Sequence, residues 1–189
     1  MNALLLNGAQ DNDEALARAQ RLLTDALERA GWQADALELR GIDITPCTGC
    51  FGCWVRTPGE CVLDDPARDV ARRAARSDLL AFLTPLTFGG YSSQLKKAVD
   101  RLVPLVSPFF MQVNGETHHK PRYRRYPRLL GLGIADAPDA SAAELFATIV
   151  QRNALNLHAP GHAARVVARG AEEAGVRDAV QALLQEAGV

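Results

Sequence analysis

Residues 78–101, with the sequence DLLAFLTPLTFGGYSSQLKKAVDR, contain the pattern that is most informative about the fold. The apolar run from Asp78 to Pro85 predicts a buried strand, and a turn with glycine and serine leads from it into a helical pattern that starts near Ser92. A strand followed closely by a helix is the unit of a parallel sheet, because parallel neighbours are joined by a crossover that is usually helical. This stretch therefore predicts an α/β fold.

The same alternation continues on both sides of this stretch. Short apolar runs predict five strands, at residues 2–8, 33–39, 78–85, 128–135 and 164–168. Leucine and alanine at helical spacing predict five helices, at residues 11–31, 65–77, 92–106, 141–157 and 172–189. This interleaved order predicts a doubly wound five-stranded parallel sheet with helices on both faces, in three layers α/β/α.

Length and composition indicate a single domain over residues 1–189. With 189 residues, of which 48% are hydrophobic, the chain can bury one substantial core. Its formal net charge of −1 provides no global field for nucleic acid or anionic lipid. No segment approaches the roughly 20 apolar residues of a membrane span, and the N-terminal apolar run lacks the flanks of a secretion signal. We therefore expect a cytoplasmic protein without nucleic-acid or membrane partners.

All four cysteines lie in one stretch, CTGCFGCWVRTPGEC, between Cys47 and Cys61, with gaps of two, two and seven residues. Four thiolates at such spacing can turn inward around a single metal centre. Zinc fits less well, because paired C-x-x-C knuckles are usually farther apart, and a reducing compartment disfavours a disulfide. The remaining alternative is a packed loop that holds no inorganic centre.

A doubly wound sheet binds ligands at the carboxyl ends of its strands, beside the point where the strand order reverses. The loops after the first, third and fourth predicted strands are therefore the candidate site. In the loop after the third strand, two glycines and two serines leave backbone N–H groups available near a helix N-terminus, which suits a planar polar ligand or an anion. An ordinary helix cap explains the same residues.

The cysteine loop, the two aspartates soon after it, TP followed by aromatic and glycine residues, and QLKKAVDR together resemble the flavodoxin-like family of NAD(P)H-dependent FMN reductases. The resemblance runs from Met1 to about Arg101, and it is greatest to the branch of the iron–sulfur flavoproteins. It implies a flavodoxin-like fold, FMN at the strand ends, hydride transfer from NAD(P)H without a catalytic acid or base from the protein, and assembly as homodimers or homotetramers.

Carried over by position, the resemblance assigns residues to both cofactors. A [4Fe-4S] cluster that passes single electrons to the flavin would be held by Cys47, Cys50, Cys53 and Cys61. Tyr91 would flank the flavin ring or, alternatively, only cover the apolar side of its loop. The FMN contacts would be Asn7, Gly8, Ala9, Gln10, Asn12, Thr84, Pro85, Leu86, Thr87, Phe88, Gly89, Gly90 and Tyr91.

The first loop departs from this family. Relatives have a Ser-Pro-Arg-like stretch that holds the FMN phosphate, whereas this chain has Asp11, Asp13 and Glu14. Each acidic residue suits a helix N-terminus, but together they oppose a dianion. Either the carboxylates point outward and the remaining loop residues supply the donors, or the flavin site has been lost.

Residues 107–128, SPFFMQVNGETHHKPRYRRYPR, are predicted to form a long basic-aromatic loop. Such a loop suits the 2′-phosphate or diphosphate of NADPH, a negatively charged protein partner, or an arm that joins subunits. A metal shared by His118 and His119 is disfavoured, because adjacent side chains point to different sides.

Together these features predict an FMN-dependent oxidoreductase that transfers electrons from NAD(P)H to a small-molecule or protein acceptor, either directly or through a [4Fe-4S] cluster. Two alternatives remain open on the sequence alone. One is a flavin-free scaffold that acts through partner binding, which the acidic first loop favours. The other is a quinone or nitro reductase that contains no iron.

Overall fold

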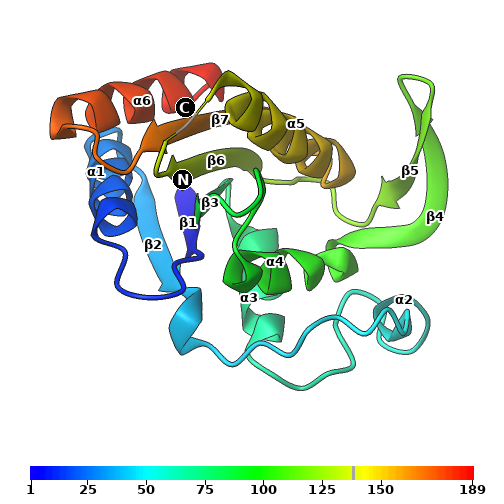
Figure 1. The fold of residues 1–189 in the computed structure, drawn as a ribbon. Coiled ribbons are helices and arrows are strands. Elements are labelled where there is room, and N and C mark those ends of the chain that lie inside the picture. The colour runs from blue at the N-terminus through cyan, green and yellow to red at the C-terminus, as the bar shows by residue number, and fades with distance from the viewer. Residues whose placement is uncertain (138) are drawn as a thin grey trace.

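A five-stranded parallel sheet forms the centre of the structure, a computed structural model that describes residues 1–137 and 139–189 (Figure 1). All neighbouring strands in it are parallel. The order reverses at β1, because the chain first adds β2 on one side and then β3 on the other. This is the predicted flavodoxin-like sheet. Its strands, in spatial order, are β2 (Gln33–Glu38), β1 (Asn2–Asn7), β3 (Leu79–Pro85), β6 (Arg128–Ala135) and β7 (His162–Ala168).

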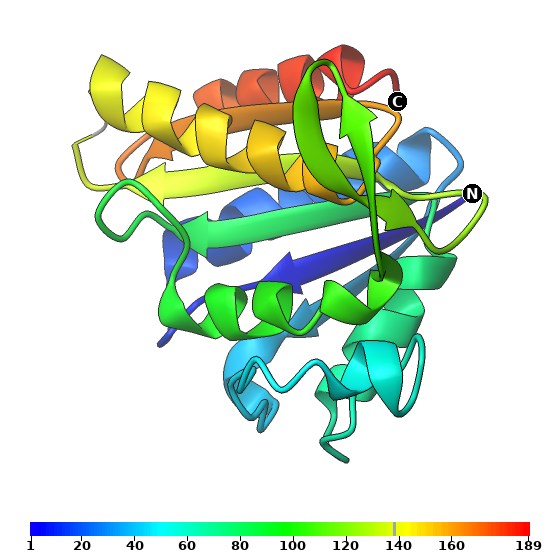
Figure 2. The same ribbon diagram turned by 90° about the vertical axis from the view of Figure 1, so that its right-hand side faces the viewer.

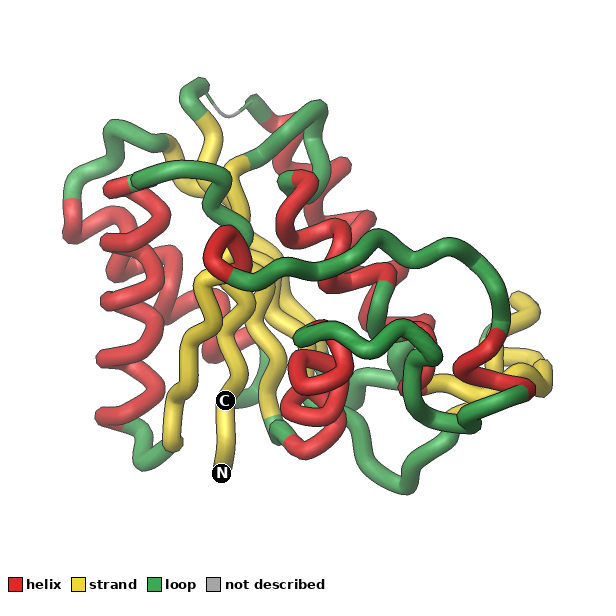
Figure 3. The backbone as a smooth tube through the Cα atoms, turned by 90° about the horizontal axis from the view of Figure 1, so that it is seen from below, coloured by secondary structure: helices red, strands yellow, loops and turns green. Residues whose placement is uncertain are grey.

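Helices cover both faces of the sheet, as Figure 3 shows. One face is covered by α1 (Glu14–Arg29) and α6 (Glu173–Glu186), which pack against each other. The other face is covered by α3 (Ala67–Arg76), α4 (Ser93–Asp100) and α5 (Ala140–Asn156). Short helices occupy the connections, namely α2 (Gly52–Val55) and the 3₁₀ turns Leu39–Gly41 and Val103–Leu105. Among the described residues, no helix is long and apolar enough to cross a membrane.

Two hydrophobic cores result, one on each face of the sheet. Along β1, Ala3 and Leu5 face one core, whereas Leu4 and Leu6 face the other. Successive side chains of a strand point to opposite faces, so a strand covered on both sides must be apolar throughout. For this reason the strands read as continuous apolar runs in the sequence.

The prediction of a loop at residues 107–128 is wrong, because most of this segment forms a β-hairpin. The strands β4 (Val106–Val113) and β5 (Glu116–Pro121) pair antiparallel and project away from the main sheet (Figure 1). Asn114 (φ 51°) and Gly115 (φ 83°) form the two-residue turn, and Asn-Gly is the pair that such turns favour. The predicted helix at 92–106 is also shorter, since α4 ends at Asp100 and only a 3₁₀ turn follows.

Candidate functional site

A cleft of about 970 Å³ lies at the carboxyl edge of the sheet, where the loops after β1, β3 and β7 meet. The loop after β1 and the start of α1 together form most of its wall. One side is closed by Pro85 at the end of β3 and another by Arg169, the residue after β7. The lining residues are Gln10, Asp11, Asn12, Asp13, Glu14, Ala15, Ala17, Arg18, Arg21, Pro85 and Arg169.

The first loop is tied to the neighbouring strand and helix. The Gly8 N–H donates to the carbonyl of Leu83 at 2.8 Å, and the buried Asn7 side chain accepts the Ala9 N–H at 2.9 Å. A Cβ atom on Gly8 would lie 2.6 Å from the Cβ of Leu95, so only glycine fits between β1 and α4. The loop therefore has a defined path where a ligand would meet it.

Several backbone N–H groups of this loop are available to a ligand. Within the described chain, the amides of Gln10, Asp11 and Asn12 donate to no protein acceptor, and neither do those of Glu14 and Ala15 in the first turn of α1. Converging amides at a helix N-terminus favour an anion, because the helix dipole adds to their partial charges. The geometry thus fits a phosphoryl group.

The three acidic residues of this loop differ in their surroundings. The side chain of Asp13 is only 4% exposed, and its carboxylate caps α1 by accepting the Leu16 N–H at 3.0 Å. The same carboxylate accepts a hydrogen bond from Nη1 of Arg169 at 2.6 Å. Asp11 and Glu14 are exposed. The most buried of the three charges is therefore paired.

Sequence reasoning missed the arginines of this cleft. Arg169 also donates from Nε to Asp136, the residue after β6, at 2.6 Å. Arg18 donates to the carbonyl of Ala171 at 2.8 Å, and within the described chain neither Arg18 nor Arg21 has a carboxylate within 4.0 Å. The position of Arg169 directly after the last strand was the signal available, since that position lies at the carboxyl edge.

Ser92 locks the loop after β3 to the loop after β1. Its hydroxyl donates to the Gly8 carbonyl at 2.5 Å and accepts the Leu95 N–H at 3.2 Å as the N-cap of α4. Thr84 is buried, and its hydroxyl accepts the Ser92 N–H at 2.9 Å. The two predicted FMN-binding loops are therefore joined by hydrogen bonds through Ser92.

The rest of the predicted ring-binding stretch forms a tight turn. Thr87 and Gly90 exchange backbone hydrogen bonds of 3.1 and 2.9 Å, while Phe88 (φ 50°) and Gly89 (φ 76°) occupy the left-handed region at the tip. Phe88 is 102% exposed, and of the stretch 84–91 it is Pro85 that lines the cleft. The turn thus leaves a large aromatic ring in solvent beside the carboxyl edge.

Tyr91 points into the core rather than toward the cleft. Its ring meets Phe82 and Phe146 edge-on, and its hydroxyl accepts a hydrogen bond from Asn153 at 3.0 Å. Burial raises the pKa of Tyr91 well above its usual value. This placement is that of the alternative interpretation, in which Tyr91 covers the apolar side of the loop.

The cysteine loop holds four reduced thiols near one another. Cys47 and Cys50 are exposed, whereas Cys53 and Cys61 are half-buried. A hydrogen bond from the Gly52 N–H lowers the pKa of Cys50, while burial, and next the charge of Cys61, raise the pKa of Cys53. Among the described residues, however, no three Cys, His, Asp or Glu side chains are arranged to hold one metal ion. The donors suit a metal, but the positions of the thiols do not yet form a ligand set.

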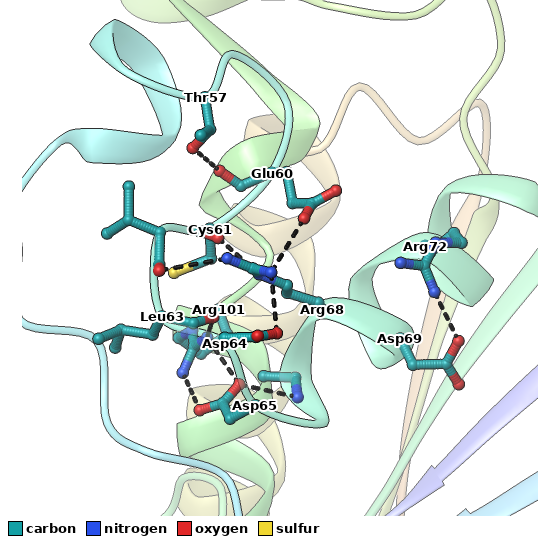
Figure 4. Close-up of polar contacts among 12 residues, drawn as sticks. Thr57, Glu60, Cys61, Leu63, Asp64, Asp65, Arg68, Asp69, Arg72 and Arg101 are labelled. Carbon is teal, nitrogen blue, oxygen red and sulfur yellow. Dashed lines mark hydrogen bonds and ion pairs between the residues drawn. The ribbon is translucent and has the colours of Figure 1, made fainter.

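A buried ion pair closes the neck of this loop, as Figure 4 shows. The guanidinium of Arg101, 2% exposed, contacts both carboxylate oxygens of Asp65 at 2.7 and 2.8 Å. Arg101 also donates to the carbonyl of Thr45 at 2.6 Å, and Asp65 accepts the Thr45 N–H at 3.0 Å. Residues on either side of the four cysteines are thereby joined. Nearby, Arg68 donates to the carbonyl of Cys61 at 2.8 Å.

The hairpin packs against the cysteine loop through aromatic side chains. The indole N–H of Trp54 donates to the Val106 carbonyl at 3.0 Å, and its ring stacks on Phe51 and contacts His119. His118 instead lies between Asn156 and Glu116, at 3.0 Å from each. The two histidines thus face different surroundings, as expected.

The basic segment after the hairpin lies away from the cleft. Arg122 donates to the Pro104 carbonyl at 2.8 Å, and Arg125 binds Asp78, just before β3, at 2.6 Å. These contacts are at the amino ends of the strands, and in Figure 2 the hairpin and the loops at the arrowheads lie toward opposite sides. Within one chain, the structure therefore does not bring this segment to the predicted flavin site.

Two archaeal proteins are similar to part of this chain. An iron–sulfur flavoprotein from Methanocaldococcus jannaschii is 30% identical over 81 residues, which are 43% of this chain and 41% of that protein. An iron–sulfur flavoprotein from Archaeoglobus fulgidus is 30% identical over 78 residues, 41% of this chain and 34% of that protein. The matched region thus spans less than half the length of these curated relatives.

Solved structures share the fold over nearly the whole chain. The NAD(P)H:quinone oxidoreductase from Methanothermobacter marburgensis has a TM-score of 0.71 at 15% identity, with 97% of this chain and 96% of that chain covered. An FMN-dependent NADH-azoreductase from Bacillus anthracis in complex with FMN has a TM-score of 0.69 at 10% identity, with 99% and 97% covered. At such identities the likeness establishes the fold alone.

A sequence match to a family model agrees with the flavodoxin-like sheet and with the cleft at its carboxyl edge. The model for NADPH-dependent FMN reductase matches residues 1–123, which is more than half of the chain. This protein belongs to the NADPH-dependent FMN reductase family of oxidoreductases.

Proposed function

We propose that this protein binds FMN at the carboxyl edge of its sheet and uses it to pass electrons from NAD(P)H to a small-molecule or protein acceptor. The observation that carries the proposal is the set of backbone amides at Gln10, Asp11 and Asn12 beside the 970 Å³ cleft, which donate to no acceptor among the residues that the structure describes. FMN, when bound, supplies the hydride chemistry, and the protein supplies binding, orientation and electrostatics.

The roles of the residues follow from their positions. The amides of residues 10–12 and the first turn of α1 bind the phosphate, while Asn7, Gly8 and Ala9 hold the loop in shape. The turn Thr84–Gly90 lies against the ring, where its amides stabilise negative charge on the reduced flavin. No side chain acts as a proton donor or acceptor in this proposal, so the catalytic contribution is positioning and electrostatics.

FMN binding is tested by fluorescence titration, with riboflavin as the ligand that lacks the phosphate. We expect FMN fluorescence to be quenched on binding to the purified protein. A variant with Asp11, Asp13 and Glu14 changed to Ser keeps the helix cap and removes three charges. Failure of both proteins to bind FMN at high micromolar concentration refutes the proposal and favours the flavin-free scaffold. Tight binding by the variant alone means that the acidic loop weakens a site that is otherwise intact.

We propose, as a second and separate function of the cysteine loop, that its four thiols take up a [4Fe-4S] cluster. The C-x-x-C-x-x-C spacing and the similarity to archaeal iron–sulfur flavoproteins support this proposal. The loop would have to close around the cluster, because the thiols are not arranged as a ligand set. Without a cluster, the protein would be an iron-free reductase, with quinones as the first acceptors to test.

We also propose that the protein assembles as a homodimer or homotetramer through the hairpin. Phe109 is 68% exposed and Phe110 is 62% exposed on β4, and large exposed aromatic side chains are typical of interface centres. Changing both to Ser is expected to lower the oligomeric mass measured by light scattering. An unchanged mass excludes the hairpin as the interface.

A further inference from the structure

The acidic first loop raises a question that family membership does not answer, namely how a buried carboxylate beside the phosphate site is tolerated. Asp13 is 4% exposed, so water screens its charge poorly. A bare carboxylate at this position would oppose a dianionic phosphoryl group. In the structure, the guanidinium of Arg169 pairs with this carboxylate at 2.6 Å.

The pair joins distant parts of the chain at the wall of the cleft. Asp13 is the N-cap of α1, and Arg169 follows β7, 156 residues later in the sequence. The backbone N–H of Arg169 donates to the Ala135 carbonyl at 2.8 Å, so the backbone of Arg169 is held at the edge of the sheet. Both residues line the 970 Å³ cleft.

Capping alone does not require this arginine. Asp13 already accepts the Leu16 N–H at 3.0 Å, and an uncharged Asn or Ser would cap the helix about as well. Nor does Asp136 need Arg169, because the Asp136 side chain is 86% exposed and water screens its charge. The consequence specific to Arg169 is the neutralisation of the one poorly solvated carboxylate at the phosphate end of the cleft.

We propose that Arg169 is a positioning residue that makes the acidic first loop compatible with a bound phosphoryl group, by neutralising Asp13 and holding its carboxylate away from the anion. This inference rests on the proposed function, and it names the residue on which phosphate recognition depends in this chain. It predicts that the effect of Arg169 on binding exists only while Asp13 carries a charge and only for ligands that carry a phosphate.

The test is a double-mutant cycle with Arg169→Gln, Asp13→Asn and the double variant, titrated with FMN and with riboflavin. We expect Arg169→Gln to weaken FMN binding on the order of tenfold, because an uncompensated charge then faces the phosphate. Riboflavin binding should stay unchanged. The double variant should bind FMN within about twofold of the wild type, because both charges are gone. The loss in Arg169→Gln should shrink at high salt.

Arg177→Gln is the matched control, since Arg177 pairs with Glu173 on the exposed surface of α6. Thermal melts of all variants establish that they fold. The inference is overturned if Arg169→Gln binds FMN as the wild type does, if FMN and riboflavin weaken equally, or if Asp13→Asn fails to restore binding. The first outcome removes any role for the pair, and the other two leave it a purely structural role.

Inorganic phosphate separates this inference from the proposed function. If the wild type binds neither flavin, the flavin proposal fails, and the rise in melting temperature with added phosphate decides the role of Arg169. A rise in the wild type and the double variant, but not in Arg169→Gln, supports the inference. No rise in any of the three proteins overturns it as well.

Discussion

Asp65→Asn is expected to destabilise the protein by about 2–4 kcal/mol, because it leaves the Arg101 guanidinium buried without a carboxylate. Breaking a buried ion pair from one side typically costs about 3–5 kcal/mol. The expected value is lower here, since the Asp65 side chain is 12% exposed and Arg101 keeps its hydrogen bond to the Thr45 carbonyl at 2.6 Å. For a chain of 189 residues, a loss of about 3 kcal/mol lowers the melting temperature by about 6–12 °C.

The same pair gives the prediction a pH dependence. Burial alone would raise the pKa of Asp65, but the Arg101 guanidinium and the Thr45 N–H outweigh burial and hold this pKa below its usual range. A lowered pKa in the folded state means that the stabilisation is fully present above the unfolded pKa, about 4, and is lost as the pH falls through the folded value. The difference between wild type and variant should therefore be constant at neutral pH and shrink below about pH 4.

Urea unfolding and limited proteolysis measure two sides of this effect. Urea curves give the loss of stability, and cleavage between Thr45 and Asp65 reports whether the neck of the cysteine loop has opened. Asp69→Asn is the matched control, because Asp69 pairs with Arg72 on the surface, where ion pairs contribute about 0–1 kcal/mol. A loss below about 1 kcal/mol in Asp65→Asn, with unchanged cleavage of the loop, would show that the buried pair does not stabilise the protein.

Three further changes test other parts of the structure. Gly8→Ala should lower the free energy of unfolding by about 1–3 kcal/mol through overpacking and weaken FMN binding, because the new Cβ would lie 2.6 Å from the Cβ of Leu95. An unchanged melting temperature would show that β1 and α4 can separate there. The Arg152 guanidinium and then His118 lower the pKa of Glu116 to about 2. The contact between the hairpin and α5 should therefore be fully present above the unfolded pKa of about 4.3 and be lost as the pH falls toward 2. Equal hydrogen exchange of β5 in wild type and Glu116→Gln at pH 6 would contradict this. A single Cys→Ser change at Cys47, Cys50, Cys53 or Cys61 should remove most of the iron from anaerobically reconstituted protein, while flavin binding and the cooperative melt persist. Reconstituted wild-type protein with well under one iron per chain would rule out the cluster proposal.

The central sheet and the loops that meet at its carboxyl edge could be predicted from local sequence patterns. A strand that is covered on both faces must be apolar along its whole length, so β1, β3 and β6 are visible as local runs. The turn at Asn114 and Gly115 was equally local, but the aromatic and charged residues around it lack the alternation of a half-buried strand. The hairpin was therefore not predicted, although the Asn-Gly pair of its turn is visible in the sequence.

Which polar groups are neutralised and which remain available depends on contacts between distant parts of the chain. Asp13 meets Arg169 from 156 residues away, and Asp65 meets Arg101 from 36 residues away. The side chain of Tyr91 turns to Asn153, 62 residues along the chain, rather than to the cleft. The periodicity of apolar residues along one strand or helix indicates which of its residues are buried. The partner of a charged side chain depends instead on how the crossovers bring separate strand ends together. For this reason the sequence shows an acidic loop that opposes phosphate, whereas the pairing of Asp13 with Arg169 is seen only in the fold.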